Sequence, residues 1–143
     1  MIRLIRHGAA SGQFSGLGEI VIDRPDKRNA LTPVMLADIS AGVQALETDA
    51  SVRAITLRGE GAVFCSGFDL SLCRETSEAL AQMLRGLSDA IRRLRRCPKP
   101  VVIAAHGAAI AGGCALLGGA DLVVTNMEAK LGYPVVRLGI SPA

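Results

Sequence analysis

Apolar residues recur at helical spacing in two long segments of the chain. The first, residues 33–48, follows Thr32 and opens with Pro33, a helix-capping residue and a proline suited to the first helical position. The second, residues 77–96, ends at a stretch with two prolines, residues 97–100. The periodic positions are Met35, Leu36, Ile39, Val43 and Leu46 in the first segment, and Leu80, Met83, Leu84, Leu87, Ile91 and Leu94 in the second. The spacing predicts two amphipathic helices, each with one face in a core.

Short runs of β-branched and other apolar residues alternate with these helices. They lie at residues 19–23, 52–58, 101–105 and 121–125, and a last extended piece begins at Leu131. A shorter apolar helix over residues 114–117 opens at the glycine pair Gly112-Gly113. Because strands and helices alternate along the chain, we predict an α/β fold in which most strands pair in parallel.

Length and composition restrict the class of protein further. The 143 residues, 50% of them hydrophobic, predict one domain over residues 1–143 with a substantial core. Charged residues or glycine interrupt every apolar run before the ~20 residues that a membrane span needs, and the charged N-terminal segment does not fit a signal peptide. The four cysteines form no CxxC pair and no ligand cluster with the two histidines, so we expect no metal site and free thiols in a reducing compartment. These features together predict a soluble cytoplasmic protein.

The net charge of +3 comes mostly from four arginines at the end of the second long helix. Arg92, Arg93, Arg95 and Arg96 there complement the helix dipole and are expected to be solvated. Aromatic residues for stacking on bases make up only 3% of the chain. A nucleic-acid partner is therefore not expected.

Two glycine-containing strand ends are the candidate chemical site. Residues 66–68 (Ser-Gly-Phe) and 111–113 (Ala-Gly-Gly) follow successive strands, and the second opens a helix whose free N–H groups favour a negative oxygen. If these segments pair, two main-chain N–H groups converge on one point. Such a pair forms an oxyanion hole, in which loss of one donor typically costs ~10²–10³ in rate.

Four ordered segments of the chain resemble the enoyl-CoA hydratase/isomerase (crotonase) family over about residues 18–143. They are RPDKRNAL at residues 24–31, AVFCSGFDL at 62–70, KPVVIAAHG at 99–107 running into AGGC at 111–114, and ADLVV at 120–124 with AKLGYP at 129–134 and LGISP at 138–142. The resemblance implies a truncated form of the family's spiral of ββα repeats. It also implies an acyl-CoA thioester as substrate, with coenzyme A as part of that substrate and no separate cofactor, and assembly into homo-oligomers, trimers or multiples of them.

Carried over residue by residue, the resemblance places the two oxyanion-hole donors at the N–H groups of Phe68 and Gly112. The substrate-binding residues that it implies are Arg28 near the phosphates of coenzyme A, Ala30 and Leu31 near its adenine, and Ser66, Gly67, Asp69 and Leu70 in the loop that carries the first donor. Without the resemblance, Lys27 and Arg28 read as a solvated turn. We interpret Asp69 as a cap of the following turn in preference to a base.

The chain departs from the family where the acids of the hydratases and isomerases lie. The two hydratase glutamate positions correspond to Ala115 and Val135, and the acid of the isomerase and dehalogenase branches corresponds to Ala143. None of these side chains can transfer a proton.

Other titratable side chains do not replace the missing acids convincingly. His106 is expected to bind a turn, and Tyr133 is a poor base because of its high intrinsic pKa. Cys65 has no evident histidine partner, and Glu128 is expected to face solvent.

Two functional hypotheses from different classes therefore stand. One is an enzyme, a relative of the hydratases and isomerases by resemblance, whose proton-transfer groups are unassigned. Family chemistries such as decarboxylation or thioester hydrolysis fit the loss of the glutamates better than hydration does. The other is a catalytically inactive acyl-CoA-binding or scaffold protein. A dinucleotide-binding domain is disfavoured, because the glycines of Gly16-Leu17-Gly18 precede the first predicted strand and have no third glycine after them. Since members of the family are roughly twice this length, we expect apolar surface that oligomer contacts would cover.

Overall fold

The centre of the molecule is a five-stranded sheet with the strand order β1-β2-β3-β4-β6. The computed structural model describes residues 1–8, 12–13, 15–75, 77–134 and 136. β2, β3, β4 and β6 are parallel, and β1 joins the edge antiparallel to β2. A second sheet pairs β5 with β7 in parallel. The bounds are β1 Ile2–Arg6, β2 Leu17–Ile22, β3 Ala54–Gly59, β4 Val101–Ala105, β5 Ala108–Ile110, β6 Leu122–Thr125 and β7 Lys130–Gly132.

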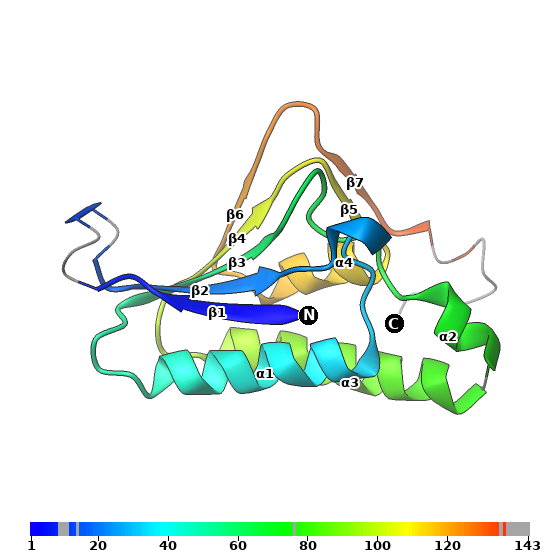
Figure 1. The fold of residues 1–143 in the computed structure, drawn as a ribbon, viewed down its shortest axis with the longest axis horizontal. Coiled ribbons are helices and arrows are strands. Elements are labelled where there is room, and N and C mark those ends of the chain that lie inside the picture. Colours follow the sequence, from blue (N-terminus) through cyan, green and yellow to red (C-terminus); the bar gives the residue numbers. More distant parts are fainter. Residues whose placement is uncertain (9–11, 14, 76, 135, 137–143) are drawn as a thin grey trace.

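Two long helices, α1 and α3, lie side by side beneath the five-stranded sheet and run in the same direction (Figure 1). α1 begins where predicted, because the Thr32 hydroxyl accepts a hydrogen bond from the Met35 N–H at 3.2 Å. The helices are α1 Pro33–Glu47, α2 Leu70–Glu75, α3 Ser77–Arg96 and α4 Gly112–Leu116, with short 3₁₀ turns η2 Pro25–Lys27 and η3 Leu117–Gly119. The predicted spans of both long helices are therefore confirmed to within a residue.

The chain repeats one structural unit along the sheet. Each of β2, β3 and β4 is followed by a short extended segment and then by a helix, and β6 is followed by β7. The short segments pair with those of the neighbouring unit: Leu31 with Phe68, Cys65 with Ala109, and β5 with β7, all in parallel. The bends that lead from β3, β4 and β6 into these segments are nested in Figure 1. This arrangement is the spiral of ββα units that the sequence predicted.

The core lies between one face of the large sheet and α1 with α3. Because side chains alternate along a strand, Ile20 and Ile22 of β2 point to the same face as Ile55 and Leu57 of β3. They contact a core cluster whose fully buried members on the helices include Leu36, Ile39, Val43, Leu46, Met83 and Leu94. Burial of each such side chain contributes about 1.5–3 kcal/mol.

The sequence did not predict three of the elements. β1 escaped prediction because Arg3 and Arg6 interrupt its apolar residues; Arg3 is neutralised by Asp23 at 2.7 Å and Glu60 at 2.8 Å. β5 consists of small residues that are weak strand formers, and it is held by pairing with β7. α2 is a short helix that follows Asp69.

The opposite edge of the sheet exposes apolar side chains. Among the described residues β6 pairs with β4 alone, and its Leu122, Val123 and Val124 are 57%, 37% and 51% exposed. The predicted open apolar surface is therefore present on the described part of the chain, while the oligomer expected to cover it stays a prediction. Among the described residues, no helix combines the length and the apolar character required to cross a bilayer.

Candidate functional site

The loop after β3 pairs with Leu31, and the N–H group of its Phe68 points away from that residue. Leu31 donates its N–H to the Gly67 carbonyl at 2.8 Å, and Asp69 donates its N–H to the Leu31 carbonyl at 2.9 Å. In this parallel pairing the N–H of Phe68, between the two, faces the other side. No acceptor for it is present among the described residues.

A second free N–H lies beside this loop, at the start of α4. Gly112 is the first residue of α4, and its N–H also has no acceptor in the described part of the chain. A Cβ atom on Gly67 would lie 3.5 Å from the Gly112 nitrogen, which shows how closely the loop and the helix approach. Gly67 has φ +97°, a conformation that favours glycine. The pairing of Cys65 with Ala109 holds the two segments together.

The residue before Gly112 has an unusual backbone conformation. Ala111 has φ 50° and ψ −117°, which residues other than glycine rarely adopt and which costs roughly 1–3 kcal/mol. Its own N–H donates to the Gly132 carbonyl of β7 at 2.8 Å. Pairing with β7 therefore helps hold the strained residue that orients the Gly112 N–H.

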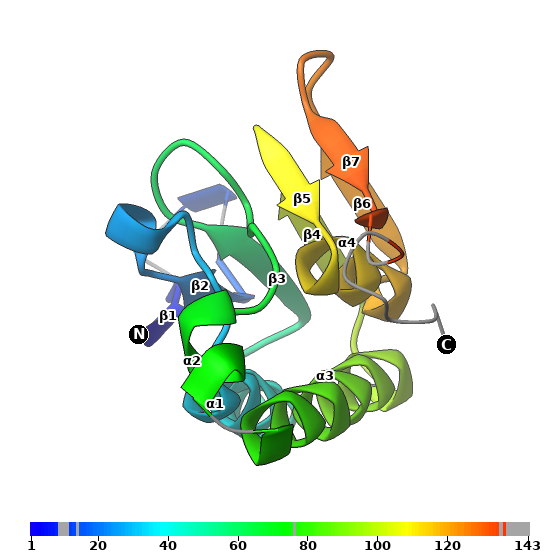
Figure 2. The ribbon, with the colours of Figure 1, turned by 90° about the vertical axis from the view of Figure 1, so that its right-hand side faces the viewer.

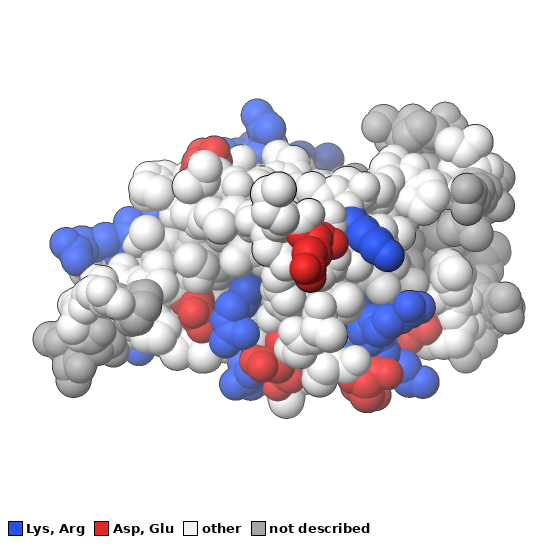
Figure 3. Space-filling view, turned by 90° about the horizontal axis from the view of Figure 1, so that it is seen from above, with Lys and Arg blue, Asp and Glu red and all other residues white. Residues whose placement is uncertain are grey.

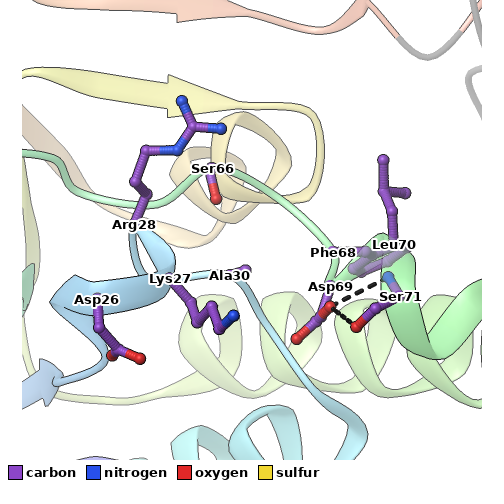
Figure 4. Close-up of a pocket in the computed structure, with 9 residues that line it drawn as sticks. All are labelled: Asp26, Lys27, Arg28, Ala30, Ser66, Phe68, Asp69, Leu70 and Ser71. Carbon is purple, nitrogen blue, oxygen red and sulfur yellow. Dashed lines mark hydrogen bonds between the residues drawn. The ribbon is translucent and has the colours of Figure 1, made fainter.

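A hollow of about 390 Å³ lies next to the Phe68 loop (Figure 4). Its lining comes from the turn of residues 24–31, from the loop before α2 and from the start of α2. In Figure 2 the blue 3₁₀ turn η2 and the green α2 lie on the same side of the molecule. The lining residues are Asp26, Lys27, Arg28, Ala30, Ser66, Phe68, Asp69, Leu70 and Ser71. The lining thus combines two cations, Lys27 and Arg28, with two carboxylates and the apolar residues Phe68 and Leu70.

Six of the nine site residues predicted from the sequence lie in the wall of this hollow, and three do not. Arg28, Ala30, Ser66, Phe68, Asp69 and Leu70 are lining residues. Leu31 is fully buried in the core, and Gly67 is buried in the loop where it approaches α4. Gly112 is buried against the Phe68 ring, since a Cβ added to it would lie 3.1 Å from Phe68 Cε1. Phe68 therefore connects the hollow to both free N–H groups, because it lines the hollow, carries one N–H group and packs against Gly112, which carries the other.

Asp69 caps α2 in the manner predicted. One of its carboxylate oxygens accepts the Ser71 N–H at 3.1 Å and the Ser71 hydroxyl at 2.5 Å. The other accepts from the Arg24 guanidinium at 2.7 Å. These contacts hold the pKa of Asp69 below its ordinary value. The Ser71 hydroxyl has the largest effect, followed by Arg24 and the Ser71 N–H. A carboxylate so occupied is a poor proton acceptor.

Asn29 anchors the turn that forms the other side of the hollow. Its side chain is fully buried, donates to the Glu60 carbonyl at 2.9 Å and to the Val63 carbonyl at 2.8 Å, and accepts from the Arg24 N–H at 2.9 Å. It also has φ 56°, a conformation that asparagine tolerates better than most residues. The sequence analysis did not single out Asn29 or Arg24, because their partners lie up to 45 residues away in sequence.

Cys65 is not suited to act as a nucleophile. Its side chain is fully buried, and burial raises the pKa of the thiol from 9.0 to about 12, although the Gly67 N–H donates to its sulfur at 3.4 Å. We expect iodoacetamide at pH 8 to leave Cys65 unmodified in the folded protein, since a shift of this size lowers the thiolate fraction about 10³-fold. Peptide mass mapping checks this against half-buried Cys97 in the same sample. Equal labelling of Cys65 before and after unfolding would contradict it.

The remaining candidate acids and bases lie as expected where the structure describes them. His106 Nε2 contacts the Gly61 carbonyl at 2.8 Å, so it binds a turn, and Glu128 is exposed. Ala115, at the first glutamate position, is half-buried against the core cluster. Val135 and Ala143 lie outside the described residues. Within the described residues, no group of three or more histidines, cysteines and acids is placed to hold a metal ion.

Two of the four arginines at the end of α3 form ion pairs, and a third binds a backbone carbonyl. Arg92 pairs with Asp89 at 2.5 Å, Arg93 pairs with Glu47 at 3.2 Å, and Arg95 donates to the Gly118 carbonyl at 3.1 Å. On the face seen in Figure 3, basic and acidic side chains are interspersed, with no broad area of one sign. Arg92, Arg95 and Arg96 are exposed, as the sequence predicted, whereas Arg93 is half-buried against Glu47.

Comparisons with known proteins identify this arrangement. The family model described as enoyl-CoA hydratase/isomerase matches residues 12–143. An enoyl-CoA isomerase/hydratase of Mycosarcoma maydis is 32% identical over 143 residues, which covers 93% of this chain and 52% of that protein. The chain spans about half the length of the curated relatives it matches.

Solved structures show the same relationship. An enoyl-CoA hydratase/isomerase from Xanthobacter autotrophicus Py2 superposes with a TM-score of 0.86 at 33% identity, covering 98% of this chain and 51% of that one. An enoyl-CoA hydratase from Polaromonas sp. JS666 gives a TM-score of 0.86 at 32% identity, covering 99% and 54%. The fold is therefore the crotonase fold over about half of those chains, and this chain belongs to the enoyl-CoA hydratase/isomerase family.

Proposed function

We propose that this protein binds an acyl-CoA thioester and polarises its carbonyl group through the N–H groups of Phe68 and Gly112. The observation that carries the proposal is that two neighbouring main-chain donors lack an acceptor among the described residues. Buried N–H groups are almost always paired, so two such donors at one place favour a ligand oxygen there. Oxygen that gains negative charge, as in an enolate, gains most from donors fixed in advance.

The hollow beside Phe68 supports coenzyme A as the other part of the ligand. Lys27 and Arg28 would neutralise phosphate groups, and Ala30 offers an apolar contact for adenine. Ser66 and Leu70 would border the arm that leads from the hollow toward Phe68. Apolar side chains exposed on β6 support association of copies, as the family resemblance implies.

The described residues favour chemistry that needs little proton transfer from the protein. Ala115 has no titratable group, and the Asp69 carboxylate is occupied by Arg24 and Ser71. Decarboxylation generates an enolate by loss of CO₂ and not by removal of a proton, so it fits this site better than hydration does. In thioester hydrolysis the same two N–H groups would hold the oxygen of the tetrahedral intermediate. The same absence of an acid at Ala115 favours the second candidate function, an acyl-CoA-binding protein without turnover.

A chromogenic thioester such as cinnamoyl-CoA tests the proposal directly. Because carbonyl polarisation extends the conjugated system, we expect its absorbance maximum to move to longer wavelength on binding. Gly112→Ala adds a methyl group 3.1 Å from the Phe68 ring and should reduce this shift, while Gly118→Ala, whose Cβ meets nothing within 4 Å, should retain it. Binding with an unchanged spectrum in the parent protein would refute the oxyanion hole.

Hydration of crotonyl-CoA distinguishes the two candidate functions from an ordinary hydratase. We expect binding of crotonyl-CoA with no hydration at the rates typical of enzymes. Hydration at such rates would show that another group transfers the proton. It would also exclude an acyl-CoA-binding protein without catalytic activity.

A further inference from the structure

The Phe68 loop is fixed by an ion pair at the edge of the hollow. Arg24 Nη1 contacts Asp69 Oδ2 at 2.7 Å and the Ala30 carbonyl at 3.2 Å. Arg24 is not a lining residue of the hollow, whereas Asp69 is. The two side chains are only 25% and 12% exposed, so the pair is partly shielded from solvent.

The geometry of the pair connects both sides of the hollow. Arg24 precedes η2, and its N–H is held by the buried Asn29 side chain. Asp69 follows Phe68 directly. One of its carboxylate oxygens accepts from Ser71 (Figure 4), and the other accepts from Arg24. A single guanidinium thus joins the turn of residues 24–31 to the residue next to the free N–H.

The pair also determines the charge next to that N–H. Unpaired, the Asp69 carboxylate would be a negative charge one residue from a donor that is proposed to hold a negative oxygen. The Arg24 guanidinium compensates this charge and fixes the direction of the carboxylate, because its Nη1 donates to Asp69 and to the Ala30 carbonyl at the same time.

We propose that Arg24 is a positioning residue of the thioester site, which orients the Phe68 N–H by holding Asp69. The role in thioester binding rests on the proposed function, whereas the ordering of the Phe68 loop by Arg24 does not. Arg24 acts through Asp69 and does not touch the thioester.

The test uses three variants of the full 143-residue chain. Arg24→Met removes the charge and keeps an apolar stem, and Arg24→Lys restores a charge on a shorter side chain whose ammonium group is placed differently. Arg93→Met is the control, because Arg93 forms a similarly shielded ion pair with Glu47, 33% and 22% exposed, on the long helices.

The first readout needs no ligand. We expect hydrogen exchange in the peptide containing residues 66–72 to accelerate roughly tenfold in Arg24→Met and to stay unchanged in Arg93→Met. The second readout is the cinnamoyl-CoA spectrum. Arg24→Met should lose at least half of the red shift at saturating ligand, Arg24→Lys should recover part of it, and Arg93→Met should keep it in full.

The outcomes separate this inference from the proposed function. If the parent protein binds cinnamoyl-CoA without a red shift, or does not bind it, the proposed function fails, while the exchange data still decide whether Arg24 orders the loop. If the parent shows the red shift and Arg24→Met keeps both it and the exchange rates, the inference is wrong. Should Arg24→Met not fold, Asp69→Asn replaces it, since the amide oxygen can still accept from Ser71; an unaltered red shift in that variant would equally overturn the inference.

Discussion

Replacing Gly113 with alanine is expected to lower the free energy of unfolding by about 3 kcal/mol, although alanine is the better helix former. A Cβ atom at this position would lie 2.6 Å from the Cys65 carbonyl oxygen, 2.8 Å from Cys65 Cβ and 2.9 Å from Cys65 Sγ. Cys65 cannot easily withdraw, because its N–H donates to the Ala108 carbonyl and its carbonyl accepts from the Ile110 N–H, both at 3.0 Å. The gain of about 1 kcal/mol in helix propensity is therefore smaller than the cost of displacing this paired backbone.

Urea unfolding followed by circular dichroism measures the effect. Gly118→Ala is the matched control, because an added Cβ there meets nothing within 4 Å, and its stability should change by less than about 0.5 kcal/mol. Equal unfolding midpoints for the Gly113→Ala variant and the parent would show that α4 can move away from Cys65. The close approach proposed for the two N–H groups would then lack its structural basis.

Local sequence signals predicted the long helices correctly because those signals act within a few residues. Thr32 and Pro33 determine where α1 begins, and the prolines after Arg96 end α3. The apolar period then determines which face meets the sheet. β1 and β5 could not be predicted in this way, because their stability comes from pairing with β2 and with β7, distant in sequence.

The candidate site shows the same division between local and distant signals. The glycines at residues 67 and 112 indicated close backbone approach, and the family resemblance indicated which N–H groups meet. The Ala111 conformation gave no signal, because alanine is not the residue expected at positive φ. Arg24 gave none either, since its role depends on a carboxylate 45 residues further along the chain.

Replacing Asn29 with alanine is expected to cost about 3 kcal/mol of stability, a large effect for the removal of one polar side chain. The variant leaves the carbonyls of Glu60 and Val63 and the N–H of Arg24 without the partner that each has now. Each buried group deprived of its hydrogen bond typically costs 1–3 kcal/mol, and rearrangement or entering water recovers part of the sum. Alanine also fits the φ of 56° poorly, which adds strain.

Two further variants separate these causes. Asn29→Gly accepts the positive φ but restores none of the three hydrogen bonds, so we expect it to regain at most about 1 kcal/mol relative to Asn29→Ala. Asn126→Ala is the control for losing an exposed asparagine and should be nearly neutral by the same urea titration. If Asn29→Gly matched the parent protein, backbone strain would account for the whole effect and the hydrogen bonds to Glu60 and Val63 would not anchor the turn. Because the same turn carries Arg24 and Arg28, a loss of its anchor should also weaken cinnamoyl-CoA binding under conditions where the variant is still folded.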